Sequence, residues 1–159
     1  MAEGFIRSAS DYPSYRVVGE RIAVAASAVE TGGLELFHQI GEAGQGPPPH
    51  AHPWDETFIV VKGEVEIGVG DKAALCGPGG VAHAPAGTYH WFRFVSDGEM
   101  VSVTSRAGAA DFFADVDRTT EGSADLETLL PVALRHGLQV PEPPAAVEAM
   151  IEVLPASPA

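Results

Sequence analysis

Residues 44–63 read GQGPPPHAHPWDETFIVVKG, a loop rich in glycine and proline followed by β-branched and aromatic residues that predict a strand. Even numbers of residues separate His50, His52 and Glu56. Side chains at even offsets in a strand share a face, so all three can point to one side, although Pro53 disturbs a regular ladder. Two imidazoles and a carboxylate on one face predict a site for Fe, Mn, Ni, Co, Cu or Zn.

A second stretch carries the same chemistry further along the chain. Residues 79–94 read GGVAHAPAGTYHWFRF, which places His90 after a Pro-x-Gly turn, at the start of an apolar run. A turn followed by an aromatic run is typical of a strand. If this strand lies beside the first one, His90 completes a four-ligand site.

The rest of the chain up to about residue 107 predicts an all-β fold. Apolar or alternating runs at 21–28, 34–40 and 65–69 are followed by short runs at 73–76, 80–84, 89–95 and 99–105. The chain of 159 residues contains 18 Gly and 13 Pro, which bound these runs. Eight to ten short strands at regular spacing are typical of a closed barrel or a sandwich.

The C-terminal third has a helical pattern. We expect a short helix at 111–117 and a second one that Ser123 caps and that runs to about His136, with Pro131 kinking it or ending it early. A last short helix is expected at 145–153. The predicted organisation is a lead-in at 1–19, a barrel at 20–107 and a helical extension at 108–159 packed on the barrel.

Charge and composition limit the partners. The chain has 9 Lys and Arg against 22 Asp and Glu, a net charge of -13, which disfavours nucleic acids and anionic membrane surfaces. Its one cysteine, Cys76, excludes an internal disulfide and a cysteine-based zinc site. No basic segment followed by an apolar run opens the sequence, so we expect a cytoplasmic protein.

Together the two stretches resemble the two motifs of the cupin superfamily. The first motif, G-x5-H-x-H-x3-E-x6-G, is matched by Gly44, His50, His52, Glu56 and Gly63. The second, G-x5-P-x-G-x2-H-x3-N, is matched by Gly79, Pro85, Gly87 and His90, with Phe94 at the usual asparagine.

This resemblance covers about residues 20–106, and it implies both a fold and a metal site. The fold is a double-stranded antiparallel β-helix, the jelly-roll barrel of cupins. The site is one divalent transition metal held by His50, His52, Glu56 and His90. Phe94 is not a ligand, so its departure from the motif leaves this expectation intact.

Residue parity also predicts a pocket around the metal. Phe58 and Val60 share the face of Glu56, and Phe92 and Phe94 share the face of His90, so the barrel interior would be apolar and partly aromatic. The same residues also suit a plain hydrophobic core. His38 lies on an apolar strand face, either as a hydrogen-bonded barrel or interface histidine or as a group that contacts substrate.

Three neutral imidazoles and one carboxylate around a divalent ion leave a net charge of about +1 and roughly two open coordination positions. Such a site suits an anionic, oxygen-bearing ligand. Small single-barrel cupins similar to this chain include flavonol-type dioxygenases, in which Glu56 would be both ligand and proton acceptor. The alternatives are a Lewis-acid isomerase or cyclase and a non-catalytic cupin that binds a small molecule. Cupins often pair their sheet edges, so a homodimer is expected.

Overall fold

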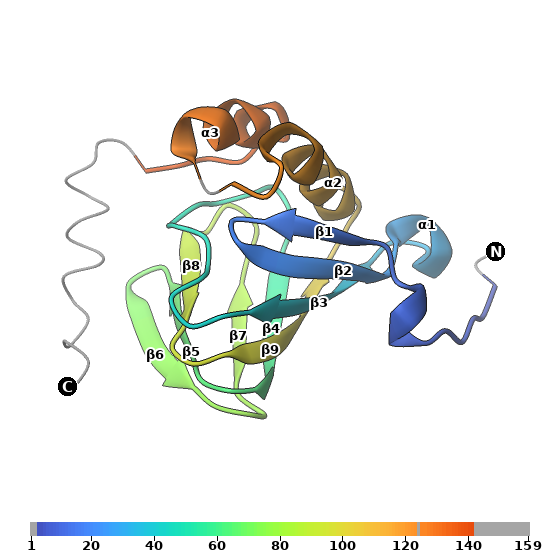
Figure 1. Cartoon of the computed structure of the whole chain (residues 1–159), viewed down its shortest axis with the longest axis horizontal. Helices are drawn as coiled ribbons and strands as arrows, with labels where there is room; N and C mark the ends of the chain where they lie inside the picture. The colour runs from blue at the N-terminus through green and yellow to red at the C-terminus, as the bar shows by residue number, and fades with distance from the viewer. Residues whose placement is uncertain (1–2, 124, 142–159) are drawn as a thin grey trace.

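The structure is a computed structural model and describes residues 3–123 and 125–141. Its strands form two antiparallel sheets (Figure 1). The larger sheet contains, in spatial order, β1 (Ser14–Val17), β2 (Glu20–Ala26), β3 (Glu35–Gly41), β9 (Gly98–Thr104), β4 (Glu56–Lys62) and β7 (Val81–Ala84). The smaller sheet contains β6 (Lys72–Cys76), β5 (Val65–Val69) and β8 (His90–Phe94).

Alternating burial along the central strands shows that each sheet turns one face inward. In β3, Glu35, Phe37 and Gln39 are buried, and the residues between them are only half-buried. Strand β9 alternates in the same way over its whole length. Side chains of successive strand residues point to opposite faces, so this pattern marks an inner and an outer face. The predicted all-β jelly-roll fold is confirmed.

A hydrophobic cluster fills the space between the two sheets. It takes residues from both sheets, namely Phe58, Val60, Met100, Val65, Ile67, Phe92 and Phe94. The ring of Phe94 lies so close to β3 that a Cβ atom at Gly41 would come within 2.2 Å of it. Only glycine therefore fits at position 41 beside this ring.

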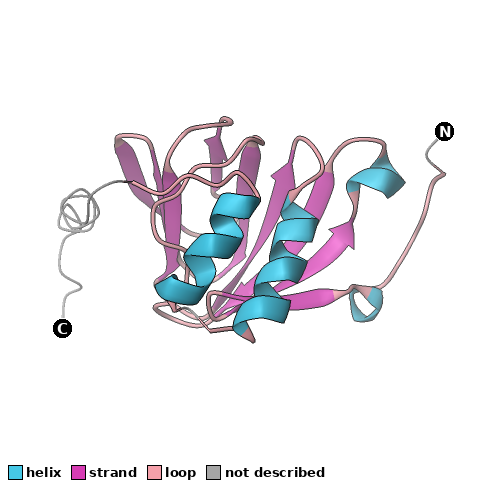
Figure 2. Cartoon of the chain, turned by 90° about the horizontal axis from the view of Figure 1, so that it is seen from above, coloured by secondary structure: helices cyan, strands magenta, loops and turns pink. Residues whose placement is uncertain are grey.

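A second cluster joins the larger sheet to the helices α2 (Ala109–Thr120) and α3 (Leu126–Arg135). Figures 1 and 2 show the two helices lying together over one end of the strands. The ring of Phe37 in β3 meets the ring of Phe113 in α2 edge to face, with centroids 5.0 Å apart. The helices thus cover the end of the barrel that the strands leave open.

A residue of the sheet caps the first of these helices. Gly108 at the N-terminus of α2 has no side chain to cap it, and the carboxylate of Glu35 accepts hydrogen bonds from the backbone N–H groups of Ala109 (2.9 Å) and Ala110 (3.3 Å). The first N–H groups of a helix lack partners within the helix. Glu35 therefore fixes the position of α2 relative to β3.

Several element boundaries differ from the expectation. Strand β1 and the short helix η1 (Ala9–Asp11) lie within the segment expected to be a lead-in, and a further short helix, α1 (Ala28–Thr31), follows β2. Asp125, rather than Ser123, caps α3 by accepting from the N–H of Glu127. Pro131 does not end α3, which continues to Arg135. The helix expected at 145–153 lies outside the described residues.

None of the helices among the described residues combines the length and the apolar character that crossing a membrane requires.

Candidate metal centre

The loop before β4 carries the first two histidines and is held against β8. His50 and His90 exchange two backbone hydrogen bonds, of 3.0 and 2.9 Å, which form an isolated antiparallel bridge. Gly46 makes this approach possible, because a Cβ atom there would lie 2.1 Å from the carbonyl oxygen of Phe92. The glycine-rich loop thereby brings the first motif and the second motif together in space.

The three imidazoles are oriented by the same local contact. Each ring nitrogen Nδ1 lies beside a backbone carbonyl two residues away in the chain: Pro48 (2.9 Å) for His50, Trp54 (2.8 Å) for His52 and Thr88 (2.9 Å) for His90. A carbonyl only accepts hydrogen bonds, so each Nδ1 carries the proton. The lone pair of each neutral ring is then on Nε2, the arrangement that metal-binding histidines adopt.

The structure brings these three rings to one point. One nitrogen from each of His50, His52 and His90 lies within 4.8 Å of the others. The Nε2 atom of His90 is buried and has no hydrogen-bond partner among the described residues. Leaving a buried nitrogen without a partner costs stability, and a metal ion coordinated by it would remove that cost. The donor set therefore fits a divalent transition metal.

Glu56, the first residue of β4, lies beside two of the three rings. Its Oε2 is 2.9 Å from Nε2 of His52 and 3.6 Å from Nε2 of His90, and the side chain is buried. Burial raises the pKa of this carboxyl, but the contacts with His52 and His90 outweigh burial and lower the pKa to about 2. Glu56 is therefore a carboxylate at neutral pH, as a metal ligand must be.

The electrostatics of His50 also favour metal binding. Burial, together with the neighbouring His90, lowers the pKa of His50 to about 3. The ring is therefore neutral at physiological pH, and its Nε2 lone pair is not occupied by a proton. A cation can bind to this centre without first displacing a proton from His50.

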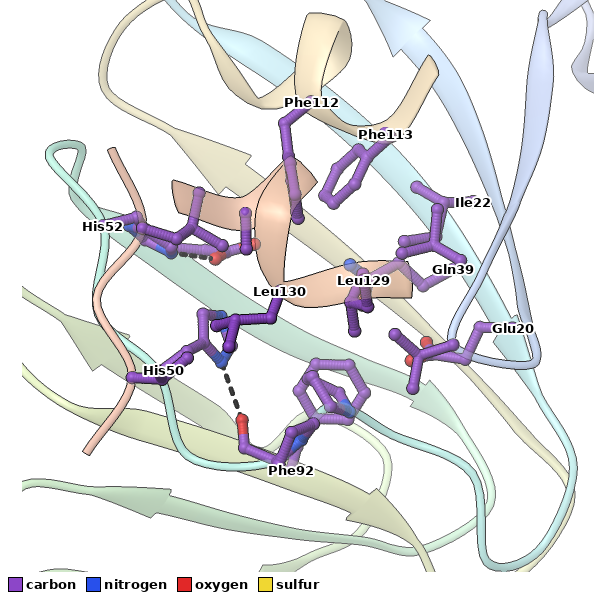
Figure 3. A pocket seen from close by; sticks show the side chains of 18 of the residues that line it. Glu20, Ile22, Gln39, His50, His52, Phe92, Phe112, Phe113, Leu129 and Leu130 are labelled. Carbon is purple, nitrogen blue, oxygen red and sulfur yellow. Dashed lines mark hydrogen bonds and ion pairs between the residues drawn. The ribbon is translucent and has the colours of Figure 1, made fainter. Parts of the chain in front are cut away.

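The histidines border a cavity of about 90 Å³ between the barrel and the helices (Figure 3). His50, His52 and Glu56 lie in its wall, and the rest of the lining is mainly apolar. Strand β8 contributes Phe92, and α2 and α3 contribute Phe112 and Leu129 among others. Since one ordered water needs roughly 10–15 Å³ by this measure, the cavity has room for a group of several heavy atoms.

Not every residue expected in the pocket lies there. All four apolar residues belong to the hydrophobic cluster between the sheets, but only Phe58 and Phe92 also line the cavity. His38 is on the outer face of β3, where its Nε2 lies 3.0 Å from Oε2 of Glu99. The structure therefore corrects the placement of His38, because β3 turns its odd-numbered residues inward.

Two cavity residues, Gln39 and Glu20, were not foreseen from the sequence. Gln39, next to His38, points inward, and Glu20 at the start of β2 is buried in the cavity wall. Trp54 is also buried there and stacks on His52 with ring centroids 4.5 Å apart. Gln39 shares a strand face with Phe37, and this alternation could have predicted that Gln39 points inward. No such signal exists for Glu20, because a glutamate at the start of a strand has the same sequence pattern as an exposed turn residue.

Comparison with known proteins agrees with this geometry. The family model described as "Cupin domain" matches residues 37–105, which span β3 to β9 and all four residues of the centre. The chain contains a cupin domain. Solved cupin structures share its fold: a RmlC-like cupin from Shewanella frigidimarina superimposes with a TM-score of 0.58 at 16% identity, covering 67% of this chain and 96% of that one.

Two further structures resemble this cupin domain. KdgF from a Halomonas species superimposes with a TM-score of 0.60 at 21% identity, over 65% of this chain and 94% of that one. Oxalate decarboxylase from Bacillus subtilis does so with a TM-score of 0.56 at 18% identity, over 65% of this chain but 30% of that one. At these identities the likeness shows the fold.

One curated protein has a closer local match to the cupin-domain chain. The oxidoreductase OpS7 of Beauveria bassiana is 49% identical to it over 55 residues. The match spans 33% of this chain and only 17% of that protein. It relates part of the two sequences and leaves most of OpS7 without a counterpart here.

Proposed function

We propose that this chain is a metal-dependent enzyme, most simply a dioxygenase, that acts on a small, mainly apolar substrate with an enolic or phenolic oxygen. The observation that carries the proposal is the placement of His50, His52 and Glu56 in the wall of a mostly apolar cavity, with the ring of His90 gathered beside the other two imidazoles. The partly matching protein, OpS7, is named as an oxidoreductase, which supports this reaction class.

The ligand charges favour an oxygen anion at this centre. His50, His52 and His90 are neutral as ligands and Glu56 carries one negative charge, so a divalent ion keeps a net charge of about +1. When bound, a redox-active divalent metal supplies a Lewis-acid centre for the substrate's oxygen and a route for electrons to dioxygen. A phenolate or an enolate matches the remaining charge better than a neutral oxygen does.

Glu56 is the residue placed to accept the substrate's proton. Its Oε2 lies at the centre, 2.9 Å from Nε2 of His52, so it can accept the proton of a phenol or an enol that reaches the centre. Its low pKa keeps Glu56 deprotonated at the start of the reaction. The Nδ1–carbonyl contacts hold the three rings in place meanwhile, and the apolar walls keep water away.

Metal loading followed by oxygen uptake tests the proposal. The chain is loaded with Fe(II), Mn(II), Ni(II) or Co(II) under anaerobic conditions and assayed with flavonols, catechols and simple phenols. Manganese belongs in the series because the structurally similar Bacillus subtilis oxalate decarboxylase has Mn(II) centres. We expect oxygen consumption and an oxygenated product with at least one metal and substrate. Product formed without oxygen would instead identify a Lewis-acid isomerase or cyclase, and binding without product a non-catalytic cupin.

A double substitution separates the ligands from other histidines. His50→Ala with His52→Ala removes two of the three neutral donors, so we expect metal content to fall from about one ion per chain to near zero. The control is His83→Ala, because His83 is exposed on β7 and contacts Thr57 rather than the cavity. Elemental analysis of the folded proteins provides the measurement, and stoichiometric metal in the double variant contradicts the ligand assignment.

A further inference from the structure

Two buried glutamates on neighbouring strands of the larger sheet have opposite surroundings. Glu35 on β3 is 3% exposed, and its Oε2 accepts from the backbone of Ala109 and Ala110 and from the Thr104 hydroxyl. Glu20 on β2 is 2% exposed, and its Oε2 has no hydrogen-bond partner among the described residues. Glu35 therefore has a structural role in capping α2, whereas no contact within the described part of the chain explains Glu20.

Gln39 has the same peculiarity and lies close to Glu20. It is 2% exposed, its Nε2 donates to the hydroxyl of Ser102 (3.3 Å), and its Oε1 has no partner among the residues described. Gln39 is directly opposite Ile22 in the β2–β3 ladder, and Glu20 is two residues from Ile22 on the same face. The two side chains are thus diagonal neighbours, about 7–8 Å apart between Cα atoms.

Both side chains belong to the cavity, on the side away from the metal ligands. Figure 3 shows Glu20, Gln39 and Ile22 along one side, His50 and His52 along the other, and Phe92 and Leu129 between them. Buried polar atoms without partners are rare because they cost stability. Two such oxygens in the wall of one apolar cavity point to a ligand that supplies their partners.

We propose that Glu20 and Gln39 bind a neutral hydroxyl group of the substrate, at the side of the cavity opposite the histidines. The proposal rests on the proposed function, because it takes the cavity as the place where the substrate binds. The substrate would then have two polar ends, an oxygen for the metal and a hydroxyl for this pair, with an apolar body between them.

The chemistry of the pair favours a hydroxyl over a charged group. The contact with Ser102 uses the amide nitrogen of Gln39, so its Oε1 is presented as an acceptor and needs a donor. Burial, and after it the charge of Glu56, raises the pKa of Glu20 well above its usual range, so its acid form can donate as well as accept. The described lining includes no lysine or arginine to pair with a substrate carboxylate.

Ligand binding tests the proposal with Co(II)-loaded protein and three probes: phenol, resorcinol and hydroquinone. Phenol has only the oxygen for the metal, and the other two add a second hydroxyl at different positions on the ring. We expect one of the two diphenols to bind about tenfold more tightly than phenol, and Glu20→Met or Gln39→Met to abolish that preference without lowering metal content. Equal affinities in the wild type, or no diphenol binding at millimolar concentration, would overturn the proposal.

A second measurement needs no ligand and distinguishes a binding role from a structural one. Met has nearly the volume of Glu and no group to leave unpaired, so Glu20→Met should raise the Tm of the ligand-free protein by about 2–4 °C. Glu35→Met is the matched control and should lower the Tm, since it removes the cap of α2. A fall in Tm for Glu20→Met like that of Glu35→Met would assign Glu20 a structural role and overturn the proposal. Failure of the metal to bind, by contrast, refutes the proposed function while this comparison still reports on Glu20.

Discussion

At the scale of single residues, the metal centre depends on very short-range contacts. His50, His52 and His90 each use a carbonyl two residues away to fix the ring, so no distant part of the chain sets their tautomer. The distant parts only have to bring the rings together, which the bridge between His50 and His90 does. Local contacts orient each ring and the bridge brings the rings together, so residues from a loop and from the start of a strand can form one centre.

Phe94, which replaces the asparagine of the cupin motif, has a packing role. It is fully buried and touches both Gly41 and the aromatic ring of Phe92. We expect Phe94→Asn to leave the metal content of the folded protein near wild type, because no metal ligand changes. The free energy of unfolding should fall by about 3–5 kcal/mol, since a large apolar group is lost and an amide is buried in its place.

Urea denaturation and elemental analysis measure the two effects of Phe94→Asn separately. Phe94→Leu is the control, because it keeps the position apolar and should cost less. A large loss of metal from folded Phe94→Asn protein would show that Phe94 shapes the metal centre and would contradict this account.

At the scale of elements, helix α1 depends on a titratable residue that forms a capping box. Glu30 accepts from the backbone N–H and the hydroxyl of Ser27 at the N-terminus of the helix, and it forms an ion pair with Arg7. The hydrogen bond from Arg7, followed by those from Ser27, lowers the pKa of Glu30 from 4.5 to about 2. The helix and the N-terminal segment are therefore joined through one carboxylate.

A carboxyl whose pKa is lower in the folded state stabilises that state above its unfolded pKa, and the effect disappears as the pH falls through the folded value. We therefore expect α1 to lose protection against amide hydrogen exchange as the pH drops from about 4.5 to 2. Glu30→Gln keeps the hydrogen-bonding shape without the charge, so its protection should not vary over that range. Equal pH dependence in the two proteins would assign the effect to another group.

The helices α2 and α3 also illustrate how an element gains its place from its neighbours. Residues on α2 and α3, with Leu138 after them, share one hydrophobic cluster with β1, β2 and β3. Each helix is short, and an isolated helix of this length is marginal in water. Packing on the sheet therefore stabilises them, and in return they close the cavity beside the metal ligands.

At the scale of the whole molecule, this shared cluster predicts that barrel and helices unfold together. Phe113 is 9% exposed and contacts Phe37 across the boundary between them. Phe113→Ala should lower the free energy of unfolding by about 3 kcal/mol in a single transition. Urea titrations followed by tryptophan fluorescence and by circular dichroism should coincide.

The control for Phe113→Ala is Leu134→Ala, on the exposed side of α3 with 56% of its surface accessible. Its cost should not exceed about 0.5 kcal/mol. Two separate transitions in the Phe113→Ala protein would show that the helices form an independent unit.

Self-association is the second prediction at this scale. The edge strand β7 exposes Val81, and Ile59 and Val61 on β4 are also partly exposed (62%, 37% and 49%). An apolar edge of this kind favours pairing with a second copy. We expect light scattering at micromolar concentration to give twice the chain mass of 16.6 kDa, and Val81→Lys to shift it toward the monomer. A monomeric wild type contradicts the prediction.

The sequence by itself determined the strands from β2 onward and predicted four side chains for the centre. Strand alternation and the Gly and Pro residues that end each strand are local signals, and so is the even spacing of His50, His52 and Glu56. The match to the cupin motifs added His90 from the second stretch. The strand predictions are confirmed because each depends on residues only a few positions apart, whereas the ligand set, which joins two distant stretches, stays a prediction.

Only the tertiary structure decided which face of each strand lies inside and what closes the cavity. Both faces of β3 carry apolar residues, so the sequence left His38 as either a hydrogen-bonded histidine or a substrate contact, and the structure shows that Gln39 is the one that points into the cavity. Phe113 packs against Phe37 from more than seventy positions away and makes the odd face of β3 the buried one. Burial of this kind depends on contacts between distant segments, which no local period in the sequence encodes.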